Sequence, residues 1–417
     1  MVKSNLIERT CEIILFLFFS IFFVNLVIDD GINWILNWTL LILFLILIYS
    51  YKKFFLPIPI ALTFIIPFIT IYGVDYLFHT NQVSEDKYFN NKASEIISNF
   101  LKILPLLALS SILFYTKRSK SIFLVSLNFS LIVSISFDSY INYMYNFDRS
   151  LLINKFGMII LYDACIAALS LLTLILNFNQ RNKISIFFII LSLINLFLIV
   201  GHGSRGTWIG IPVILILITM FFFKTQRWNV ILTLVSSLTL TIFLLLIPNS
   251  PIISRVDAFK EDKVLVQQNN YNSSVGNRVF LWNFAINQFK TSPIIGVGTR
   301  QFRENICIQH KQGLIPACNP HAHNIFFQFI ATHGLLGLFG ILSAFLLPFI
   351  YFTKSYLISK NKFNDLNQYS VAGITFTLFF GICGLTDFLF FASFPTMFYF
   401  LVIITLMTLS IKKTTQT

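Results

Sequence analysis

The stretch NPHAHNIFFQFIATHGLLG, residues 319–337, marks the point where a polar loop of this chain runs into a long hydrophobic segment. His323 and Asn324 stand directly before the apolar run that begins at Ile325. This run is long enough for a membrane-spanning helix, which needs about 20 apolar residues. The stretch therefore predicts a titratable side chain at the entrance of a membrane helix, and the rest of the chain is interpreted as its scaffold.

The composition is that of an integral membrane protein. Of the 417 residues, 56% are hydrophobic and only 11% are charged. Soluble globular proteins carry about 25% charged residues. Much of the net charge of +13 lies in short connectors between apolar runs, so it indicates topology rather than binding to nucleic acid.

Twelve apolar runs predict an all-α fold, a polytopic membrane protein with about 12 transmembrane helices. The runs are residues 11–28, 34–50, 55–74, 96–115, 121–140, 156–177, 184–201, 207–223, 229–247, 325–350, 369–386 and 390–411. We expect transmembrane helices in segment 1–247, a long loop with an amphipathic helix in segment 248–324, and three further spans in segment 325–417.

Positive charges in the connectors predict the orientation of these spans. One set of connectors, including both ends of the chain, carries Lys3, Arg9, Lys52, Lys53, Lys117, Arg118, Lys120, Arg181, Lys183, Lys224, Arg227, Lys354, Lys360, Lys362, Lys412 and Lys413. Basic residues concentrate on the cytoplasmic side of membrane proteins. Both termini are therefore expected in the cytoplasm, and the long loop on the opposite face.

The long loop 248–324 contains a second pattern, which starts at Arg278. Apolar residues recur at helical spacing at Val279, Trp282, Ile286 and Phe289. This spacing predicts an amphipathic helix at the membrane interface, with Arg278 in its first turn. The helix is expected to end before Pro293, and Gly296 and Gly298 are expected to form a turn.

Five cysteines are present, and they fall into two groups. Cys11, Cys165 and Cys383 lie inside apolar runs and are expected to be small core residues. Cys307 and Cys318 share the long loop. A disulfide between them is expected if the loop lies outside the cytoplasm, and free thiols are the alternative.

The sequence GHGSRGTW at 201–208 forms a short turn between two spans. Ser204 is placed to cap the following helix, and Arg205 to lie in its first turn. Free backbone N–H groups at a helix N-terminus, together with a guanidinium, form an anion site suited to phosphate. The alternative is an arginine that reaches lipid headgroups. Both interpretations stay open on these residues alone.

Three other charged residues lie within or beside apolar runs. Lys102 is about two turns inside the run 96–115, so it either reaches the membrane surface or faces a polar cavity. Asp163 is expected to be paired with a cation or to be neutral. Asp387 is interpreted as a solvated residue of a short turn.

His321 and His323 are two residues apart, a spacing that can hold a metal ion. No convincing carboxylate or cysteine partner lies nearby in the sequence, so no metal and no cofactor is expected. A neutral imidazole at a helix N-terminus stays in its basic form, because the positive end of the helix dipole disfavours its protonation. This property suits His323 to accept a proton.

Together these features resemble the bacterial O-antigen ligase family, part of a wider group that includes O-antigen polymerases and bacterial protein O-oligosaccharyltransferases. The resemblance rests on the twelve runs, the late long loop, SRGTW at 204–208, NRVFLWNFA at 277–285, and His323-Asn324 followed by GLLG at 334–337. It covers residues 201–337 well. The first half of the chain matches only as a hydrophobic scaffold, although Lys102 stands where ligases tend to keep a cation.

The resemblance implies the C-type glycosyltransferase-like membrane fold in the bacterial inner membrane. It implies transfer of a glycan from undecaprenyl diphosphate to a sugar hydroxyl of lipid A–core on the periplasmic face, with inversion and without a metal. His323 is implied as the general base, and Arg205 and Arg278 as ligands of the diphosphate. The other residues expected to contact substrates are Lys102, His321, Asn324 and Trp282. The expected partners are the lipid-linked O-antigen donor, the lipid A–core acceptor and membrane lipids.

Three other functions are alternatives. An O-antigen polymerase uses the same donor, but those proteins usually lack a clear histidine–asparagine pattern. A protein O-oligosaccharyltransferase tends to be longer, with a C-terminal soluble region. A non-enzymatic polysaccharide flippase is expected to carry polar residues through many spans, whereas this chain concentrates its chemistry on one face.

Overall fold

The computed structural model describes residues 2–28, 41–42, 45, 54–79, 104–145, 159–178, 182–246, 250–268, 270–363, 367–391 and 393–411. Within these ranges the chain is helical and contains no β-strand, which confirms the all-α prediction. The predicted run 34–50 falls almost entirely outside the described residues, as do residues 96–103 of the fourth run.

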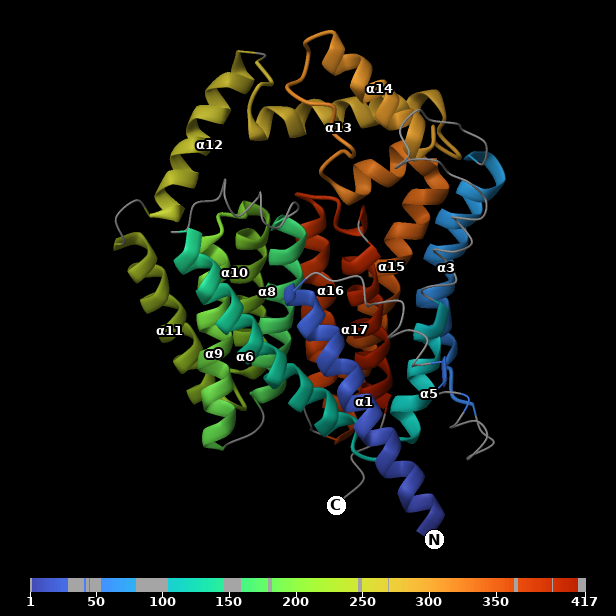
Figure 1. Cartoon of the computed structure of the whole chain (residues 1–417), viewed down its shortest axis with the longest axis vertical. Helices are drawn as coiled ribbons and strands as arrows, with labels where there is room; N and C mark the ends of the chain where they lie inside the picture. Colours follow the sequence, from blue (N-terminus) through green and yellow to red (C-terminus); the bar gives the residue numbers. More distant parts are fainter. Residues whose placement is uncertain are drawn as a thin grey trace.

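Most of the helices in the described ranges form a bundle, and a smaller group covers one end of it (Figure 1). They are α1 (Val2–Ile28), α3 (Ile58–Val74), α5 (Ala108–Tyr115), α6 (Ser119–Tyr145), α8 (Ile159–Asn177), α9 (Lys183–Gly201), α10 (Arg205–Phe222), α11 (Arg227–Leu246), α12 (Pro251–Gln267), α13 (Ser274–Thr291), α14 (Thr299–Lys311), α15 (Ile325–Phe363), α16 (Gln368–Gly384) and α17 (Ser393–Ile411). A π-helical turn, η1 (Asp75–His79), continues α3. The 3-10 turns η3 (Leu104–Leu107) and η4 (Leu389–Phe391) precede α5 and α17.

Nine helices in the described residues are long and apolar enough to cross a membrane. They lie in α1, α3, α6, α8, α9, α10, α11, α15 and α17. Two shorter apolar helices, Pro105–Tyr115 and Gln368–Gly384, fall on two further predicted runs. The multi-span character is therefore confirmed, and the count of twelve stays a prediction.

Helix α8 lies at the centre of the bundle. Every side chain from residue 161 to residue 177 is buried, and the helix contacts α6, α9, α10 and α16. Small residues such as Ala164 and Ala167 let neighbouring helices approach closely. By contrast, α11 lies at the edge and exposes apolar side chains such as Leu238 and Phe243, as a lipid-facing helix does (Figure 1).

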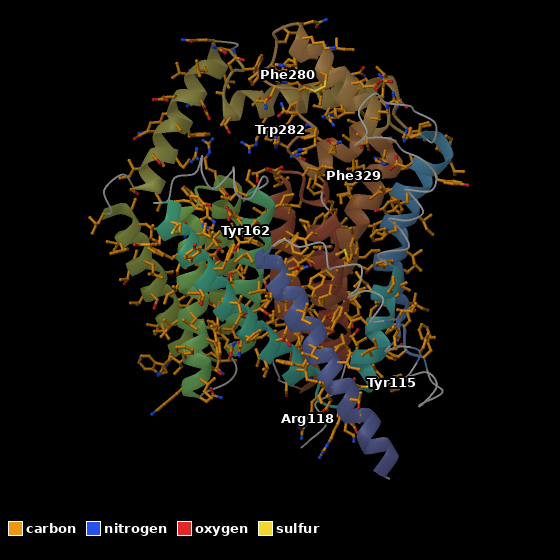
Figure 2. The ribbon with its side chains drawn as sticks, viewed as in Figure 1. Tyr115, Arg118, Tyr162, Phe280, Trp282 and Phe329 are labelled. Atoms are coloured by element: carbon orange, nitrogen blue, oxygen red, sulfur yellow. A yellow bond between two sulfur atoms is a disulfide. The ribbon has the colours of Figure 1, made fainter. Side chains whose placement is uncertain are left out.

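The helices α12, α13 and α14, called the loop helices below, lie together at one end of the bundle (Figure 1). They share a second, smaller hydrophobic cluster, in which Leu281 and Ala285 of α13 pack with Phe302 and Ile306 of α14. Tyr115 and Arg118, next to a basic connector, lie at the opposite end of the molecule (Figure 2). The loop helices and this connector are thus separated by the length of the bundle.

Helix α13 covers the predicted amphipathic helix, and the face that it buries inside the protein lies beside the predicted apolar stripe. The predicted apolar stripe is only partly buried, and its member Ile286 is exposed. The buried residues are Leu281 and Ala285, which lie on a neighbouring face of the helix. This buried face packs against α14 and α15, which supply its hydrophobic contacts, and the position of the apolar stripe at a membrane interface stays a prediction.

Helix α15 is interrupted at Gly334, whose φ of 64° is left-handed. The loop segment 293–298 packs against this break. Four backbone hydrogen bonds join them, with donors at Val297, Gly298, Leu335 and Leu336 and acceptors at Ala331, Thr332, Pro293 and Ile294, over 2.8 to 3.2 Å. A Cβ on Gly296 or Gly334 would collide with the opposing backbone. These glycines therefore attach the loop helices directly to α15.

Candidate functional site

The short turn 385–387 follows α16 and is contacted by three distant parts of the chain. Asn324 donates from Nδ2 to the first carbonyl of this turn (2.8 Å). Arg278 of α13 donates from Nε to the carbonyl of Thr386 (3.2 Å). The backbone of Gly206 in α10 lies against Thr386, since a Cβ there would collide with the threonine hydroxyl. The turn therefore brings together α10, α13 and the start of α15.

The start of α15 is shaped by the predicted histidine–asparagine pair. Oδ1 of Asn324 accepts hydrogen bonds from the backbone N–H groups of Phe326 (2.9 Å) and Phe327 (3.1 Å), which caps the helix. His323 has a φ of 49° and is the only non-glycine residue with positive φ in the described ranges. Its N–H donates to Nδ1 of His321 (3.2 Å). Such a backbone is strained and persists because its neighbours hold it.

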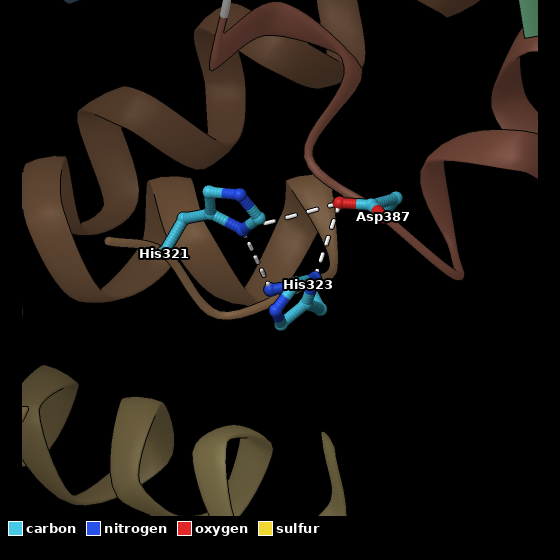
Figure 3. Close-up of side chains that lie close together, drawn as sticks. All are labelled: His321, His323 and Asp387. Carbon is cyan, nitrogen blue, oxygen red and sulfur yellow. Dashed lines mark hydrogen bonds and ion pairs between the residues drawn. The ribbon is translucent and has the colours of Figure 1, made fainter. Parts of the chain in front are cut away.

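His321, His323 and Asp387 form a compact cluster (Figure 3). Nδ1 of His323 lies 3.3 Å from Oδ1 of Asp387, and Nδ1 of His321 lies 3.9 Å from the same oxygen. The side chains of His321 and Asp387 are each 7% exposed, whereas that of His323 is 24% exposed. The imidazole of His323 is therefore the most exposed part of the cluster.

The charges around this cluster determine its protonation. Burial alone would raise the pKa of Asp387, but His323, His321 and Arg278 outweigh burial and hold this pKa at about 2. Burial and then the charge of His323 lower the pKa of His321 to about 3, despite the attraction of Asp387. At neutral pH Asp387 is therefore an anion and His321 is uncharged. The carboxylate then accepts a hydrogen bond from Nδ1–H of His323 (3.3 Å).

Arg278 projects toward the 385–387 turn from the second turn of α13, because the helix begins at Ser274, earlier than the sequence predicts. Besides its bond to Thr386, its Nη1 donates to Oγ of Ser274 (3.0 Å). Burial lowers the pKa of Arg278, Asp387 opposes this shift, and the charge of Arg205 adds to it. Because an arginine stays protonated in proteins, the outcome is a partly desolvated cation beside the histidine cluster.

Arg205 is the first residue of α10, as the sequence predicts. Its Nη2 lies 3.3 Å from Oδ2 of Asp262, and the same oxygen accepts from the backbone N–H of Val275 (3.3 Å). Nη1 of Arg205 is buried and has no hydrogen-bond partner among the described residues. Nη1 of Arg205 is thus available to donate a hydrogen bond. A buried donor without an acceptor lowers the stability of a protein, so this position favours an acceptor.

Trp282 lies one turn after Arg278 and joins α13 to α15. Its ring stacks on Phe327 at a centroid distance of 5.6 Å. Its Nε1 is buried and has no hydrogen-bond partner within the described ranges. Lys102, the other predicted substrate contact, lies outside the described residues.

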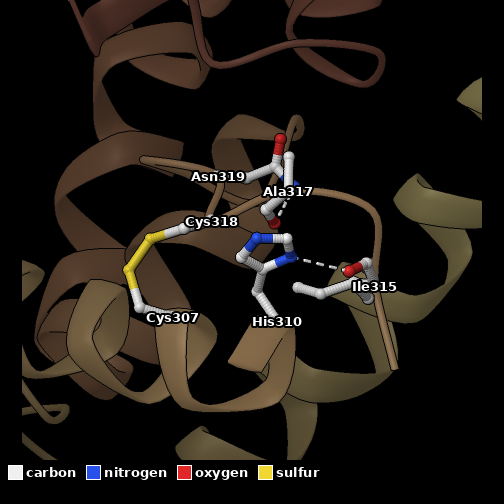
Figure 4. Close-up of a disulfide and its surroundings, with 6 residues drawn as sticks. All are labelled: Cys307, His310, Ile315, Ala317, Cys318 and Asn319. Carbon is white, nitrogen blue, oxygen red and sulfur yellow. Dashed lines mark hydrogen bonds between the residues drawn. A yellow bond between two sulfur atoms is a disulfide. The ribbon is translucent and has the colours of Figure 1, made fainter. Parts of the chain in front are cut away.

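Cys307 of α14 and Cys318 are joined by a disulfide (Figure 4). Nearby, Nδ1 of His310 lies 2.9 Å from the carbonyl oxygen of Ile315. The bond closes the loop that leads from α14 to His321 and His323. The other cysteines, Cys11, Cys165 and Cys383, are buried and free, as predicted for core residues.

Comparison with known proteins identifies the part of the chain that carries this site. A family model described as O-antigen ligase matches residues 187–342. This segment belongs to the O-antigen ligase family. An uncharacterized protein of Haemophilus influenzae is 30% identical over 158 residues, which are 37% of this chain and 40% of the relative. The chain thus spans about two fifths of the length of that curated relative.

The O-antigen ligase segment contains most of the site. Arg205, Arg278 and the cluster residues His321 and His323 fall inside residues 187–342. The 385–387 turn follows the segment, yet it is the element on which the other residues converge. The candidate site therefore includes the turn between the last two helices as well as the matched segment.

Two sequence-based interpretations are wrong. Asp387, interpreted as solvated, is 5% exposed, because it is enclosed by the histidines and by Arg278. Ser204 does not cap α10 with its side chain. Its hydroxyl donates to Asp163 instead, and Asp163 is also paired with His202 (2.7 Å). A buried carboxylate thus attracts the hydroxyl away from the helix terminus.

The sequence gives no sign of two further residues, Asp262 and Thr386. Both act through contacts with residues far along the chain, which no local spacing reveals. The position of Asp387 could have been recognised in the sequence, because Asp387 is a lone carboxylate between two apolar runs. Such a residue in a membrane protein indicates a buried partner.

His321, His323 and Asp387 each offer one atom that can bind a metal ion, and these atoms all lie within 4.8 Å of one another. The cluster is therefore a possible metal site. Two imidazoles and a carboxylate are a ligand set that zinc accepts. However, the charge of Arg278 acts on both Asp387 and His321, and it would repel a divalent cation. The arrangement suits proton transfer beside a bound anion better than it suits a metal.

Proposed function

We propose that the protein is an O-antigen ligase, which transfers a glycan from undecaprenyl diphosphate to a sugar hydroxyl of lipid A–core. The observation that carries this proposal is the convergence of Arg278, His323 and the first turn of α10, which begins with Arg205, on the 385–387 turn. Guanidinium groups suit a diphosphate. A histidine held by a carboxylate suits the removal of a proton from a hydroxyl. Transfer from a lipid diphosphate to a hydroxyl requires both.

The donor diphosphate binds to Arg205 and Arg278. Each guanidinium offers a planar fork of N–H donors, and Nη1 of Arg205 is already buried without a partner in the described residues. The start of α10 adds the positive end of a helix dipole. Asp262 pairs with Nη2 of Arg205, which leaves Nη1 to donate to the anion.

His323 acts as the general base. Its Nε2 takes the proton from the acceptor hydroxyl while the oxygen forms a bond to the anomeric carbon of the donor sugar. The bond from that carbon to the diphosphate oxygen breaks, and its electron pair leaves with the diphosphate. Attack opposite the leaving group inverts the anomeric centre. Asp387 stabilises the imidazolium that forms, because it is an anion at neutral pH.

The two arginines also stabilise the transition state. Negative charge builds on the diphosphate as the bond breaks, and fixed cations beside it lower the barrier. Donors of this kind contribute about 3–4 kcal/mol each to the rate of comparable reactions. No metal or other cofactor is needed for these steps.

Four further residues support substrate binding in this proposal. His321 accepts a hydrogen bond from the N–H of His323, and Asn324 anchors the next residue to the carbonyl of Leu385. Trp282 offers an indole N–H beside Arg278. Lys102 adds a cation for the donor phosphates, which is carried over from the family resemblance.

The membrane arrangement follows the charge pattern. We assign the basic end of the bundle to the cytoplasm with both termini, and the loop helices with the site to the periplasmic face of the inner membrane. The segments 1–247, 248–324 and 325–417 then correspond to nine spans, the periplasmic loop and three spans of a C-type glycosyltransferase-like fold. Membrane lipids surround the spans, and the lipid-linked donor and lipid A–core reach the site from the bilayer.

The experiment that tests the function is deletion of the gene, complemented with the native gene or with His323→Ala. Lipopolysaccharide is then separated on a gel, and lipid-linked glycan is quantified. We expect loss of all capped lipopolysaccharide with accumulation of lipid-linked polymer, and no rescue by His323→Ala at equal protein level.

Other outcomes would identify the alternative functions. A single repeat on the core indicates an O-antigen polymerase. Unchanged lipopolysaccharide together with loss of glycan from a protein indicates a protein O-oligosaccharyltransferase. Accumulation of lipid-linked glycan on the cytoplasmic side indicates a flippase. Each of these three results contradicts the ligase assignment.

A further inference from the structure

A fully buried cluster lies where α8 meets the turn between α9 and α10. Nδ1 of His202 is 2.7 Å from Oδ1 of Asp163, and the hydroxyl of Ser204 donates to Oδ2 of the same carboxylate. The side chains of His202 and Asp163 are 0% exposed. Both oxygens of one carboxylate in α8 thus hold two residues of the 201–206 turn.

This cluster is placed directly before Arg205. Ser204 is the N-cap residue of α10, yet its side chain makes no capping bond in this fully described helix. Its backbone carbonyl is held by the hydroxyl (2.7 Å) and the N–H (3.1 Å) of Thr207. The turn is therefore fixed from inside by Asp163, while the side chain of the next residue, Arg205, keeps 24% exposure.

The contacts of Asp163 with His202 and Ser204 are strong because they are buried. A carboxylate inside a helical bundle is costly, and a membrane protein keeps one only where it is held by close partners. Removing one partner of a buried pair is correspondingly disruptive. A small displacement of the turn would move the guanidinium of Arg205, because only one peptide bond separates Ser204 from Arg205.

We propose that Asp163 is a positioning residue for donor binding, which aims Arg205 at the diphosphate by holding His202 and Ser204. This inference rests on the proposed function, because it takes a lipid diphosphate as the ligand of Arg205. Asp163 itself does not touch the substrate. Its loss weakens donor binding, whereas His323, on another element, keeps its contacts with Asp387.

The chain offers a matched control cluster in the same bundle. Asp138 of α6 accepts from the hydroxyl of Tyr162 (2.6 Å) and from that of Ser134 (3.1 Å). Asp138 and Ser134 are both buried at 0% exposure, like Asp163 and Ser204. The hydrogen bonds of Asp138 go to Tyr162 and Ser134 and not to the 201–206 turn, and only the charge of His202 acts on Asp138 from that turn. Asp138 therefore has the chemistry and burial of Asp163 without hydrogen bonds that hold the turn.

The test measures binding of undecaprenyl diphosphate to the full chain in lipid nanodiscs. Asp163→Asn and Ser204→Ala are expected to weaken binding at least tenfold, and Ser204→Thr to restore it to within threefold of wild type. Asp138→Asn and Ser134→Ala are expected to bind within threefold of wild type. Melting temperatures are recorded for all variants. In turnover, Asp163→Asn is expected to raise KM for the lipid-linked donor more than it lowers kcat.

The outcomes separate this inference from the proposed function. Wild-type affinity in a folded Asp163→Asn or Ser204→Ala protein would overturn the positioning role alone. Equal losses in the Asp138 and Asp163 variants would assign both carboxylates to general packing and also overturn it. If the wild type itself does not bind undecaprenyl diphosphate, the proposed function fails. If Asp163→Asn does not fold, Ser204→Ala decides the result, because it removes one contact and leaves the Asp163–His202 pair in place.

Discussion

Two histidine–aspartate pairs in this protein have the same chemistry and different surroundings. Nδ1 of His323 lies 3.3 Å from Asp387, and Nδ1 of His202 lies 2.7 Å from Asp163. The imidazole of His323 is 24% exposed, whereas that of His202 is fully buried. Exposure therefore decides the role of such a pair. The exposed imidazole of the His323–Asp387 pair, called the open pair below, can exchange a proton with a substrate. The buried imidazole of the His202–Asp163 pair can only hold structure.

The two pairs also differ in the backbone that carries them. His323 has a strained left-handed conformation, held by His321. His202 has an ordinary helical backbone with φ of −69° and follows the end of α9. Strain concentrates where a side chain must point in one direction for function. The following predictions test this contrast, beginning with the largest effect.

The largest expected effect is that of His323→Ala on turnover. Loss of a general base lowers the rate by about 10²–10⁴-fold, so we expect a fall in kcat of about a thousandfold with little change in donor affinity. Steady-state kinetics with lipid-linked donor and lipid A–core measures it. His310→Ala is the control and should keep kcat, because His310 of α14 makes its hydrogen bond to the backbone carbonyl of Ile315. A His323→Ala protein with normal kcat would remove the open pair from catalysis.

Arg205→Lys and Arg278→Lys should each lower kcat/KM by about a hundredfold, although the charge is kept. A lysine has no planar fork and cannot donate to two phosphate oxygens in the same geometry. The control is Arg300→Lys, because Arg300 in α14 is already paired with Glu304 (2.9 Å). Activity within threefold of wild type in both site variants would favour arginines that reach lipid headgroups.

Asp387→Asn should lower kcat by roughly 10–100-fold. The amide keeps the shape but no longer stabilises an imidazolium, and residues that support a reactive group typically contribute this much. Asp257→Asn serves as control, because Asp257 is half exposed and pairs with Lys260 on the surface of α12. If the two variants have equal activity, the carboxylate of the open pair has no catalytic role.

The pH dependence of stability should reflect His321. Its folded pKa of about 3 is below the ordinary value of about 6.5, so the unfolded chain binds more protons between these values. The contribution of neutral His321 to the free energy of unfolding is therefore fully present above pH 6.5 and decreases as the pH is lowered. Asp387, with a pKa of about 2, adds its own loss only below about pH 4.

We expect the melting temperature to fall from pH 7.5 to pH 5 and to fall less in His321→Asn. The asparagine accepts the N–H of His323 and does not titrate. The charged groups around this position, His323, Asp387 and Arg278, are unchanged in the variant. Identical pH slopes for both proteins, measured by thermal unfolding in detergent, would show that His321 is not buried in its neutral form.

The smallest effect on turnover is expected for the disulfide. Cys307→Ser with Cys318→Ser should lower the free energy of unfolding by about 2–4 kcal/mol, because the bond restricts the unfolded chain. Turnover should stay within threefold, since the bond contacts neither pair. Mass spectrometry of protein purified without reductant should find no free thiol at either position, and free thiols at both would contradict the bond.

The sequence predicts the helices well because a membrane span needs a long apolar run, and such runs are visible without tertiary information. It also predicts that Arg205 starts a helix and that Asn324 stands at the start of another, because caps and charges are local signals. The turn after α13 follows from its glycines for the same reason.

What the sequence does not predict depends on contacts between distant residues. Asp387 is 64 positions from His323, and no spacing rule relates them. The hydroxyl of Ser204 leaves the helix terminus for Asp163, 41 positions earlier, because a buried carboxylate attracts it more strongly than the backbone does. The buried face of α13 is chosen by the helices that cover it. Tertiary packing decided each of these features over a local preference.

The central claim is that Arg205, Arg278 and His323 surround one lipid diphosphate at the 385–387 turn. The most direct test is a cryo-electron-microscopy map of the His323→Ala protein in nanodiscs with an undecaprenyl-diphosphate-linked saccharide. The account predicts diphosphate density in contact with both guanidinium groups, with the anomeric carbon facing position 323. Density for the diphosphate elsewhere, with Arg205 still paired only to Asp262, would contradict it.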